Sequence, residues 1–188
     1  MSYSPNYKVY RESRDLAWEI IIQEGIASLP VSISMLCCNI GIALKYYTPT
    51  DGNCGMSVIT DSGPAIFVDA NMPNGRKRFT AAHELGHILL GHVGRYELVN
   101  RATSQNDDPI ETAANVFASR LLAPACVLWG CNVTTAEQIA ALCGISQEAA
   151  EYRMIRMREL YSRGAFLSSP LERRVYEQFK PFIEEHRL

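Results

Sequence analysis

The spacing of apolar residues along the chain predicts helices at both ends and short strands between them. Residues 13–28 place Leu16, Ile20, Ile21 and Ile26 on one face of a helix. Similar periodicity, bounded by glycine, proline or capping residues, predicts further helices at 32–39, 74–90, 108–123, 134–143, 146–160 and 171–185.

Between the second and third of these helices the period changes. Residues 42–47, 55–60 and 65–69 are β-prone runs, separated by turn-forming clusters at 48–53 and 61–64. We therefore expect a small antiparallel sheet just before helix 74–90. The order of helices, sheet and helices is typical of the α+β class.

Length and turn signals also indicate how the chain is divided. A chain of 188 residues is long enough for one core with a small appendage. We expect a core of residues 1–125 and a C-terminal helical region, 126–188, packed on it. The second region contains a segment, 134–160, that resembles a helix-turn-helix.

Charge and hydropathy exclude several classes of protein. The 18 basic and 20 acidic side chains nearly cancel, which disfavours nucleic acid or an acidic membrane as a partner. No apolar run approaches the ~20 residues that span a bilayer. Residues 1–14 lack the apolar segment of a signal peptide. The sequence predicts a cytoplasmic protein, and it does not indicate an oligomeric state.

The six cysteines contain no C-x-x-C pair, and most lie in apolar stretches. A thiol in such a stretch behaves as a small apolar side chain, so we expect reduced, buried thiols. A structural zinc site that uses Cys126 and Cys131 is the alternative.

Candidate chemistry is concentrated in His83-Glu84-Leu85-Gly86-His87, which matches H-E-x-x-H. Residues four apart on a helix differ by about 40° and about 6 Å, so both imidazoles can bind one zinc ion while the glutamate reaches a metal-bound water. The alternative is that these residues form only a polar edge of the helix. The apolar flanks favour a buried helix instead, in which such groups need partners or a metal. The glycine costs about 1 kcal/mol in a helix, which indicates that something approaches the backbone closely there.

A catalytic zinc ion usually has a third protein ligand, and His92 is the nearest candidate. The pattern H-E-x-x-H-x-x-G-x-x-H would require glycine at 90 and histidine at 93, where the chain has Leu90 and Val93. On a continuing helix His92 would lie about 140° around the axis from His87. We interpret it as a helix-end residue that interacts with the terminal carbonyls.

Glu111 is the stronger candidate, because it lies at the start of the next helix and would complete a His₂Glu set. Residues 108–111 also read as a capping box, which would explain Glu111 without a metal and leave Asp107 or Asp108 as ligands. Asn115, one turn later, could orient the carboxylate.

The two segments together resemble the ImmA/IrrE family of zinc metallopeptidases, with similarity over about residues 25–160. The residues that carry the resemblance are Arg78-Phe79-Thr80-x-Ala82-His83-Glu84-Leu85-Gly86-His87-x-x-Leu90 and Glu111-x-x-Ala114-Asn115-x-Phe117-Ala118-x-x-Leu121-Leu122-x-Pro124. Arg120 stands where the family often has an acidic residue, and Ala123 replaces a common methionine. Neither is one of the proposed ligands, so the expected chemistry is unchanged, but the resemblance does not identify the substrate.

The resemblance implies a zincin-type helical core and a gluzincin-like site, with Zn²⁺ held by His83, His87 and Glu111 and with Glu84 as catalytic base. It further implies a zinc metalloendopeptidase that cleaves helix-turn-helix repressors of mobile elements or stress regulons. A substrate strand could add to an edge of the sheet.

The rival hypothesis is a DNA-binding regulator that uses residues 134–160. Arg153, Arg156 and Arg158 could meet phosphates, although acidic residues at 148, 151 and 159 dilute their charge. A packed helical hairpin is the structural alternative for this segment. A third hypothesis, a metal kept only for structure, is disfavoured because Glu84 would then have no role. No residue stands out as an oxyanion donor, although Tyr47, Tyr152 and His186 are candidates.

Overall fold

The computed structural model describes residues 5–50, 52–94 and 108–187. The chain forms two compact units, one of Met1–Arg14 with Ser32–Ala118 and one of Asp15–Val31 with Ser119–Leu188. Two helices, α1 (Pro5–Gln23) and α4 (Pro109–Leu122), contribute residues to both units. The boundary at residue 125 that the sequence suggests stays a prediction.

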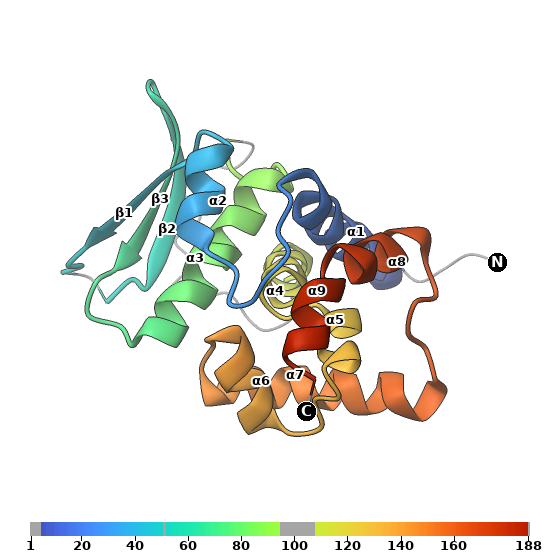
Figure 1. Cartoon of the computed structure of the whole chain (residues 1–188). Coiled ribbons are helices and arrows are strands. Elements are labelled where there is room, and N and C mark those ends of the chain that lie inside the picture. The colour runs from blue at the N-terminus through green and yellow to red at the C-terminus, as the bar shows by residue number, and fades with distance from the viewer. Residues whose placement is uncertain (1–4, 51, 95–107, 188) are drawn as a thin grey trace. The chain divides into compact units, whose positions relative to one another are not determined.

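The first unit is built on a three-stranded sheet in the order β1-β3-β2 (Figure 1). Its strands are β1 (Ala43–Tyr47), β2 (Gly55–Thr60) and β3 (Gly63–Asp69). The central strand, β3, is the most buried, with Ile66 and Val68 fully covered. The α+β class expected from the sequence is confirmed.

The sheet is mixed, and the expectation of a purely antiparallel sheet is wrong in this respect. A tight turn joins β2 to β3 in an antiparallel hairpin that pairs Thr60 with Gly63. β1 pairs with the other edge of β3 and runs parallel to it, with Ala43 opposite Ala65. The turn clusters reverse the chain as expected, but they do not determine which strands become neighbours. The most apolar strand gains most from being paired on both sides.

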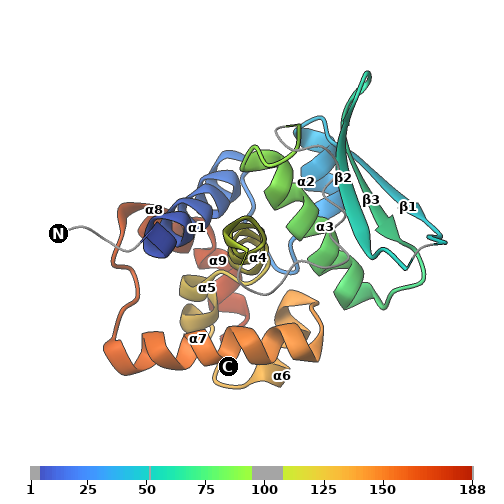
Figure 2. The same ribbon diagram turned by 180° about the vertical axis from the view of Figure 1, so that it is seen from behind.

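Two helices accompany the sheet, α2 (Ile33–Asn39) and α3 (Asn74–Leu89). Helix α2 begins at Ser32, whose hydroxyl accepts a hydrogen bond from the Met35 N–H, as expected of an N-cap. Helix α3 contacts β2 and β3, and α2 contacts β1 and α3 (Figures 1 and 2). Helix α3 carries the H-E-x-x-H motif, so the sheet provides the support for that motif.

Helix α3 packs against α4 at a glycine. A Cβ atom added at Gly86 would lie 3.0 Å from Phe117 Cδ1 and 3.3 Å from Ala114 Cα. The close approach indicated by the glycine is therefore confirmed, and the approaching group is the next helix. This packing brings the histidine-bearing face of α3 beside the first turns of α4.

The second unit is helical, and two of its features differ from the sequence prediction. Its helices beyond α1 and α4 are α5 (Ala125–Gly130), α6 (Ala136–Cys143), α7 (Gln147–Arg163), α8 (Pro170–Gln178) and α9 (Lys180–Glu185). Helix α5 was not expected, because Pro124 reads as a stop although proline also permits a helix to begin. The single helix expected at 171–185 is split at Phe179, because Pro181 has no N–H to donate.

The N-terminal helix also differs from its predicted range, since α1 covers Pro5–Gln23 rather than 13–28. Within the second unit the end of α1 is tied to the C-terminal helices. The Gln178 amide donates hydrogen bonds to the carbonyls of Ile21 and Ile26, at 2.8 and 2.7 Å. One side chain thus satisfies two carbonyls where the helix ends.

The run Pro109–Gly130, which comprises α4 and α5, is long and apolar enough to cross a membrane by length and composition. However, 78% of the apolar 18-residue stretch within this run is buried inside the molecule. A buried core helix meets the same criteria of length and composition, so this single run is weak evidence for a membrane span.

We predict that Gly86→Val lowers the free energy of unfolding by about 1–3 kcal/mol, because the added methyl groups overpack the contact with α4. The measurement is urea unfolding of the metal-free protein. Ala141→Val, at an exposed position of α6, is the control and costs only helix propensity, about 0.5 kcal/mol. Equal losses in both variants would contradict the close packing at Gly86.

Candidate metal centre

Three ligand atoms converge between α3 and α4. His83 Nε2 and His87 Nε2 lie 2.9 Å apart, one turn from each other on α3. Glu111, from the first turn of α4, places Oε2 3.2 Å from His83 Nε2 and Oε1 3.4 Å from His87 Nε2. The sequence-predicted set is therefore brought together, with its ligand atoms all within 4.8 Å of one another.

This donor set fits a small divalent cation. Zinc–nitrogen bonds of about 2.0 Å at tetrahedral angles place ligand atoms about 3.3 Å apart, close to the separations found here. Two imidazole Nε2 atoms at 2.9 Å cannot both carry protons that point at each other. A cation between them would accept both lone pairs and the carboxylate charge.

The capping and ligand interpretations of Glu111 are now separated. Asp108 caps α4, because its Oδ1 accepts a hydrogen bond from the Ile110 N–H at 2.8 Å. The Glu111 carboxylate faces the histidines instead. A hydrogen bond from His83, and to a smaller extent one from His87, holds the pKa of the Glu111 carboxyl far below its usual range. Burial acts in the opposite direction and raises this pKa. Asp107 lies outside the described residues.

Asn115, one turn after Glu111, contacts the Nδ1 edge of the His83 ring, opposite Nε2. Its Oδ1 lies 2.9 Å from His83 Nδ1. An amide oxygen only accepts, so Nδ1 of His83 donates to Asn115, and the proton that Nε2 gives to Glu111 in the metal-free protein is the one that a metal ion would replace. The sequence suggested that Asn115 orients the carboxylate, whereas this contact orients the histidine.

His92 lies against the second histidine and is not placed as a third ligand. Its Nδ1 is 3.1 Å from His87 Nδ1, on the opposite side of the ring from the Nε2 atom that faces Glu111. Its backbone N–H donates to the His87 carbonyl at 2.9 Å, so the expected contact with a terminal carbonyl is confirmed. The side-chain contact was missed, although Gly91 at the helix end gave a usable signal.

Glu84 is buried beside the candidate ligands, with only 3% of its surface exposed. Ser57 Oγ, on β2, donates a hydrogen bond to Glu84 Oε2 at 2.7 Å. Strand β2 passes close over α3 here, since a Cβ atom at Gly55 would lie 2.4 Å from Thr80 Cγ2 and 3.5 Å from Glu84 Cγ. Sequence reasoning missed Ser57, because no local pattern links a strand serine to a helix residue 27 positions away.

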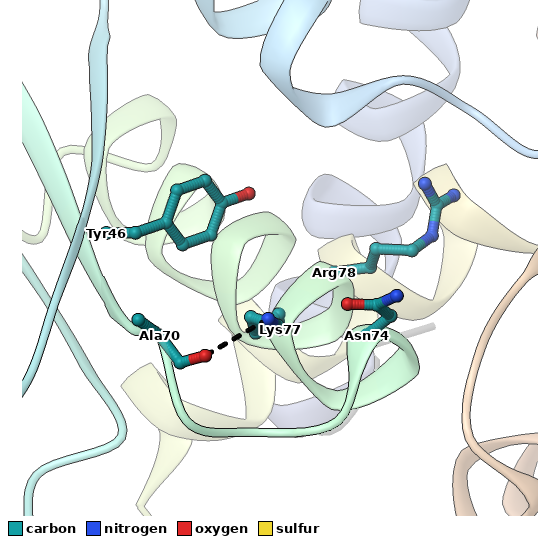
Figure 3. A pocket seen from close by; sticks show the side chains of 5 residues that line it. All are labelled: Tyr46, Ala70, Asn74, Lys77 and Arg78. Atoms are coloured by element: carbon teal, nitrogen blue, oxygen red, sulfur yellow. Dashed lines mark hydrogen bonds between the residues drawn. The ribbon is translucent and has the colours of Figure 1, made fainter.

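A separate hollow of about 340 Å³ lies at the start of α3 (Figure 3). It is lined by Tyr46, Ala70, Asn74, Lys77 and Arg78. Lys77 Nζ donates to the Ala70 carbonyl at 3.1 Å, as the dashed line shows. Two cationic side chains give the hollow positive charge, but the motif histidines are not among the residues that line it.

Two of the candidate oxyanion donors and the two candidate zinc-binding cysteines lie elsewhere in the chain. Tyr152 and His186 belong to the helical unit, and His186 Nδ1 lies 2.9 Å from the Phe182 carbonyl oxygen. Burial raises the pKa of the Cys126 thiol to about 12 and also raises that of Cys131. Neither thiol belongs to a group that could hold a metal, since among the described residues only His83, His87 and Glu111 form such a group.

The depressed pKa of Glu111 predicts a pH effect on the metal-free protein. A carboxyl whose pKa is lower in the folded chain stabilises the fold above its ordinary value of 4.5, and this contribution is lost as the pH falls. We expect the difference in unfolding free energy between wild type and Glu111→Gln to be largest near pH 6 and to shrink below pH 4.5. Urea unfolding across this range measures it.

Glu184→Gln, at an exposed site of α9, is the matched control for this experiment and should not reproduce the effect. A difference between wild type and Glu111→Gln that stays constant from pH 6 to pH 3 would contradict the pairing of Glu111 with the histidines.

Removal of the Ser57 hydroxyl should leave the buried Glu84 carboxylate without one of its hydrogen bonds. We predict that Ser57→Ala lowers the free energy of unfolding by about 1–3 kcal/mol, measured by urea unfolding. Ser62→Ala, in the exposed β2–β3 turn, should change it by less than about 0.5 kcal/mol. Equal stability of the two variants would show that the bond is unimportant.

Comparison with known families shows which family the chain belongs to. A family model described as the IrrE N-terminal-like domain of peptidase family M78 matches residues 40–154. The matched range contains His83, Glu84, His87 and Glu111, and it covers more than half of the chain. A search of curated proteins gave no match. The match over most of the first unit, together with its convergent histidines and glutamate, shows that this chain belongs to the ImmA/IrrE family of metallopeptidases.

Proposed function

We propose that the protein is a zinc-dependent endopeptidase, with His83, His87 and Glu111 as metal ligands and Glu84 as catalytic base. The observation that carries the proposal is the convergence of His83 Nε2, His87 Nε2 and the Glu111 carboxylate within 4.8 Å. Two imidazoles and a carboxylate form the ligand set of several zinc peptidases. The same donors also suit manganese or iron, and metal analysis of the purified protein distinguishes these from zinc.

A bound zinc ion would lower the pKa of its water toward about 7 and polarise the scissile carbonyl. Glu84 takes the proton of the attacking water and passes it to the leaving amine. The Ser57 hydroxyl holds one oxygen of Glu84 from the strand side, which limits rotation of the carboxylate. Asn115 keeps His83 Nε2 directed at the position that the metal ion would occupy.

Strand β2 is the element that we propose to hold an extended substrate. It forms one edge of the sheet and passes over α3 at Glu84. Its Ile59 side chain is 57% exposed. A peptide that adds to such an edge gains main-chain hydrogen bonds, which favours a protein substrate over a small molecule.

The substrate that we propose is a helix-turn-helix repressor of a mobile element or stress regulon, as the family resemblance implies. We also propose that cleavage takes place in the cytoplasm. All six cysteines are free thiols, which is usual in a reducing compartment.

The rival DNA-binding function has less structural support. Helices α6 and α7 are joined by a short turn with Gly144 in the left-handed conformation, as in a helix-turn-helix. However, Arg153 is buried and donates to the Ala123 carbonyl at 2.8 Å, and Arg156 forms an ion pair with Glu159. Two of the three arginines expected to meet phosphates are thus engaged within the unit, which favours the packed-hairpin interpretation.

We predict that Glu84→Gln binds one zinc ion per chain but cleaves the helix-turn-helix repressor, which the family resemblance leads us to expect beside it in the genome, at least about 100-fold more slowly. The amide keeps the size of the side chain but cannot accept the water proton. Mass spectrometry of the repressor measures cleavage, and metal analysis measures zinc.

The controls for this experiment are wild-type protein stripped with a chelator, then restored with zinc. Undiminished cleavage by Glu84→Gln would refute the base assignment. Wild-type protein that binds no zinc would refute the metal site. Zinc-loaded wild type that leaves the repressor intact would refute the substrate.

A further inference from the structure

The contact between His87 and His92 joins two chemically identical atoms. Their Nδ1 atoms are 3.1 Å apart, and the rings meet edge to face with centroids 5.2 Å apart. A hydrogen bond at this distance needs one proton between two nitrogens, so one Nδ1 donates and the other accepts. The direction of the bond determines which nitrogens remain for a metal.

The geometry of the ligand group fixes that direction. His87 Nε2 is the atom that faces His83 Nε2 and Glu111, so in the metal-loaded protein it offers its lone pair to the metal in place of a proton shared with Glu111. A neutral imidazole carries a single N–H, which then lies on Nδ1 of His87. His92 Nδ1 is therefore the acceptor, and the proton of His92 lies on its Nε2.

The end of α3 explains how His92 reaches this position. Gly91 has φ +71°, its N–H donates to the Ile88 carbonyl at 3.1 Å, and the His92 N–H donates to the His87 carbonyl at 2.9 Å. These two bonds form a Schellman motif, which reverses the chain and brings the residue after the glycine back over the last turn. Backbone and side chain of His92 thus both contact His87.

Burial makes the acceptor necessary. The side chain of His87 is fully buried, and an N–H in such a place costs free energy unless it is hydrogen-bonded. His83 has its own acceptor in Asn115. The two proposed ligands therefore have one acceptor each, an amide from α4 for His83 and an imidazole from the end of α3 for His87.

We propose that His92 is a positioning residue that fixes the tautomer and orientation of His87 and thereby sets the affinity of the site for zinc. This inference rests on the proposed metal site, and it assigns a role to a histidine that is itself no ligand. Partners of this kind commonly change metal affinity by 10–100-fold.

The test compares two variants that differ in whether residue 92 can accept a hydrogen bond from His87. His92→Leu removes the acceptor and keeps an apolar side chain, whereas His92→Asn places its Oδ1 where Nδ1 of the histidine stood. We expect the zinc dissociation constant of the leucine variant to rise by about 10–100-fold and that of the asparagine variant to stay within about threefold of wild type. Competition against a chromophoric chelator measures both constants.

His186→Leu is the matched control, because that histidine contacts a backbone carbonyl and no proposed ligand. It should leave the zinc dissociation constant unchanged. Thermal unfolding of the metal-free variants verifies that each is folded at the temperature of the titration. Wild-type affinity in His92→Leu, or equal losses in the leucine and asparagine variants, would overturn the proposal.

A spectroscopic measurement tests the direction of the bond without any variant. In ¹⁵N-labelled, zinc-loaded protein we expect the proton of His87 on Nδ1 and the proton of His92 on Nε2. A proton on His92 Nδ1 would overturn the proposal while leaving the metal site intact. Wild-type protein that binds no zinc would instead overturn the proposed function, and the role of His92 with it.

Discussion

The close packing of α3 on α4 is the contact on which the candidate centre depends. Gly86 lets Phe117 and the Ala114 backbone approach α3 to within a distance that a side chain would prevent. His87 follows Gly86 directly, and Glu111 precedes Ala114 by one turn, so this contact sets the separation of the histidines from the carboxylate. A larger side chain at Gly86 would change both separations, from His83 to Glu111 and from His87 to Glu111, together.

Around this contact, each chemical group has a partner from a different segment. Asn115 on α4 holds His83, His92 beyond the end of α3 holds His87, and Ser57 on β2 holds Glu84. Buried polar groups are costly without hydrogen bonds, so these partners offset the cost of placing two histidines and a glutamate in a core helix. They also restrict rotation, which a metal centre needs in order to keep its geometry.

The sheet contributes in a way that local patterns could not reveal. Because β3 is central, β2 is left at an edge and is brought over α3 at Glu84. The sequence predicted all three strands and their turns, yet it predicted an antiparallel sheet, since turn residues show that the chain reverses but not which strands pair. The bond between Ser57 and Glu84 follows from that pairing and could not be read from the sequence.

The sequence by itself determined the motif, the α+β class and the candidate ligands, because helical periodicity places residues four apart on one face whatever surrounds them. Tertiary structure alone decided that Glu111 turns to the histidines while Asp108 caps the helix, and that His92 folds back onto His87. Those outcomes depend on distances between segments, and such distances are set by packing rather than by the spacing of residues along the chain.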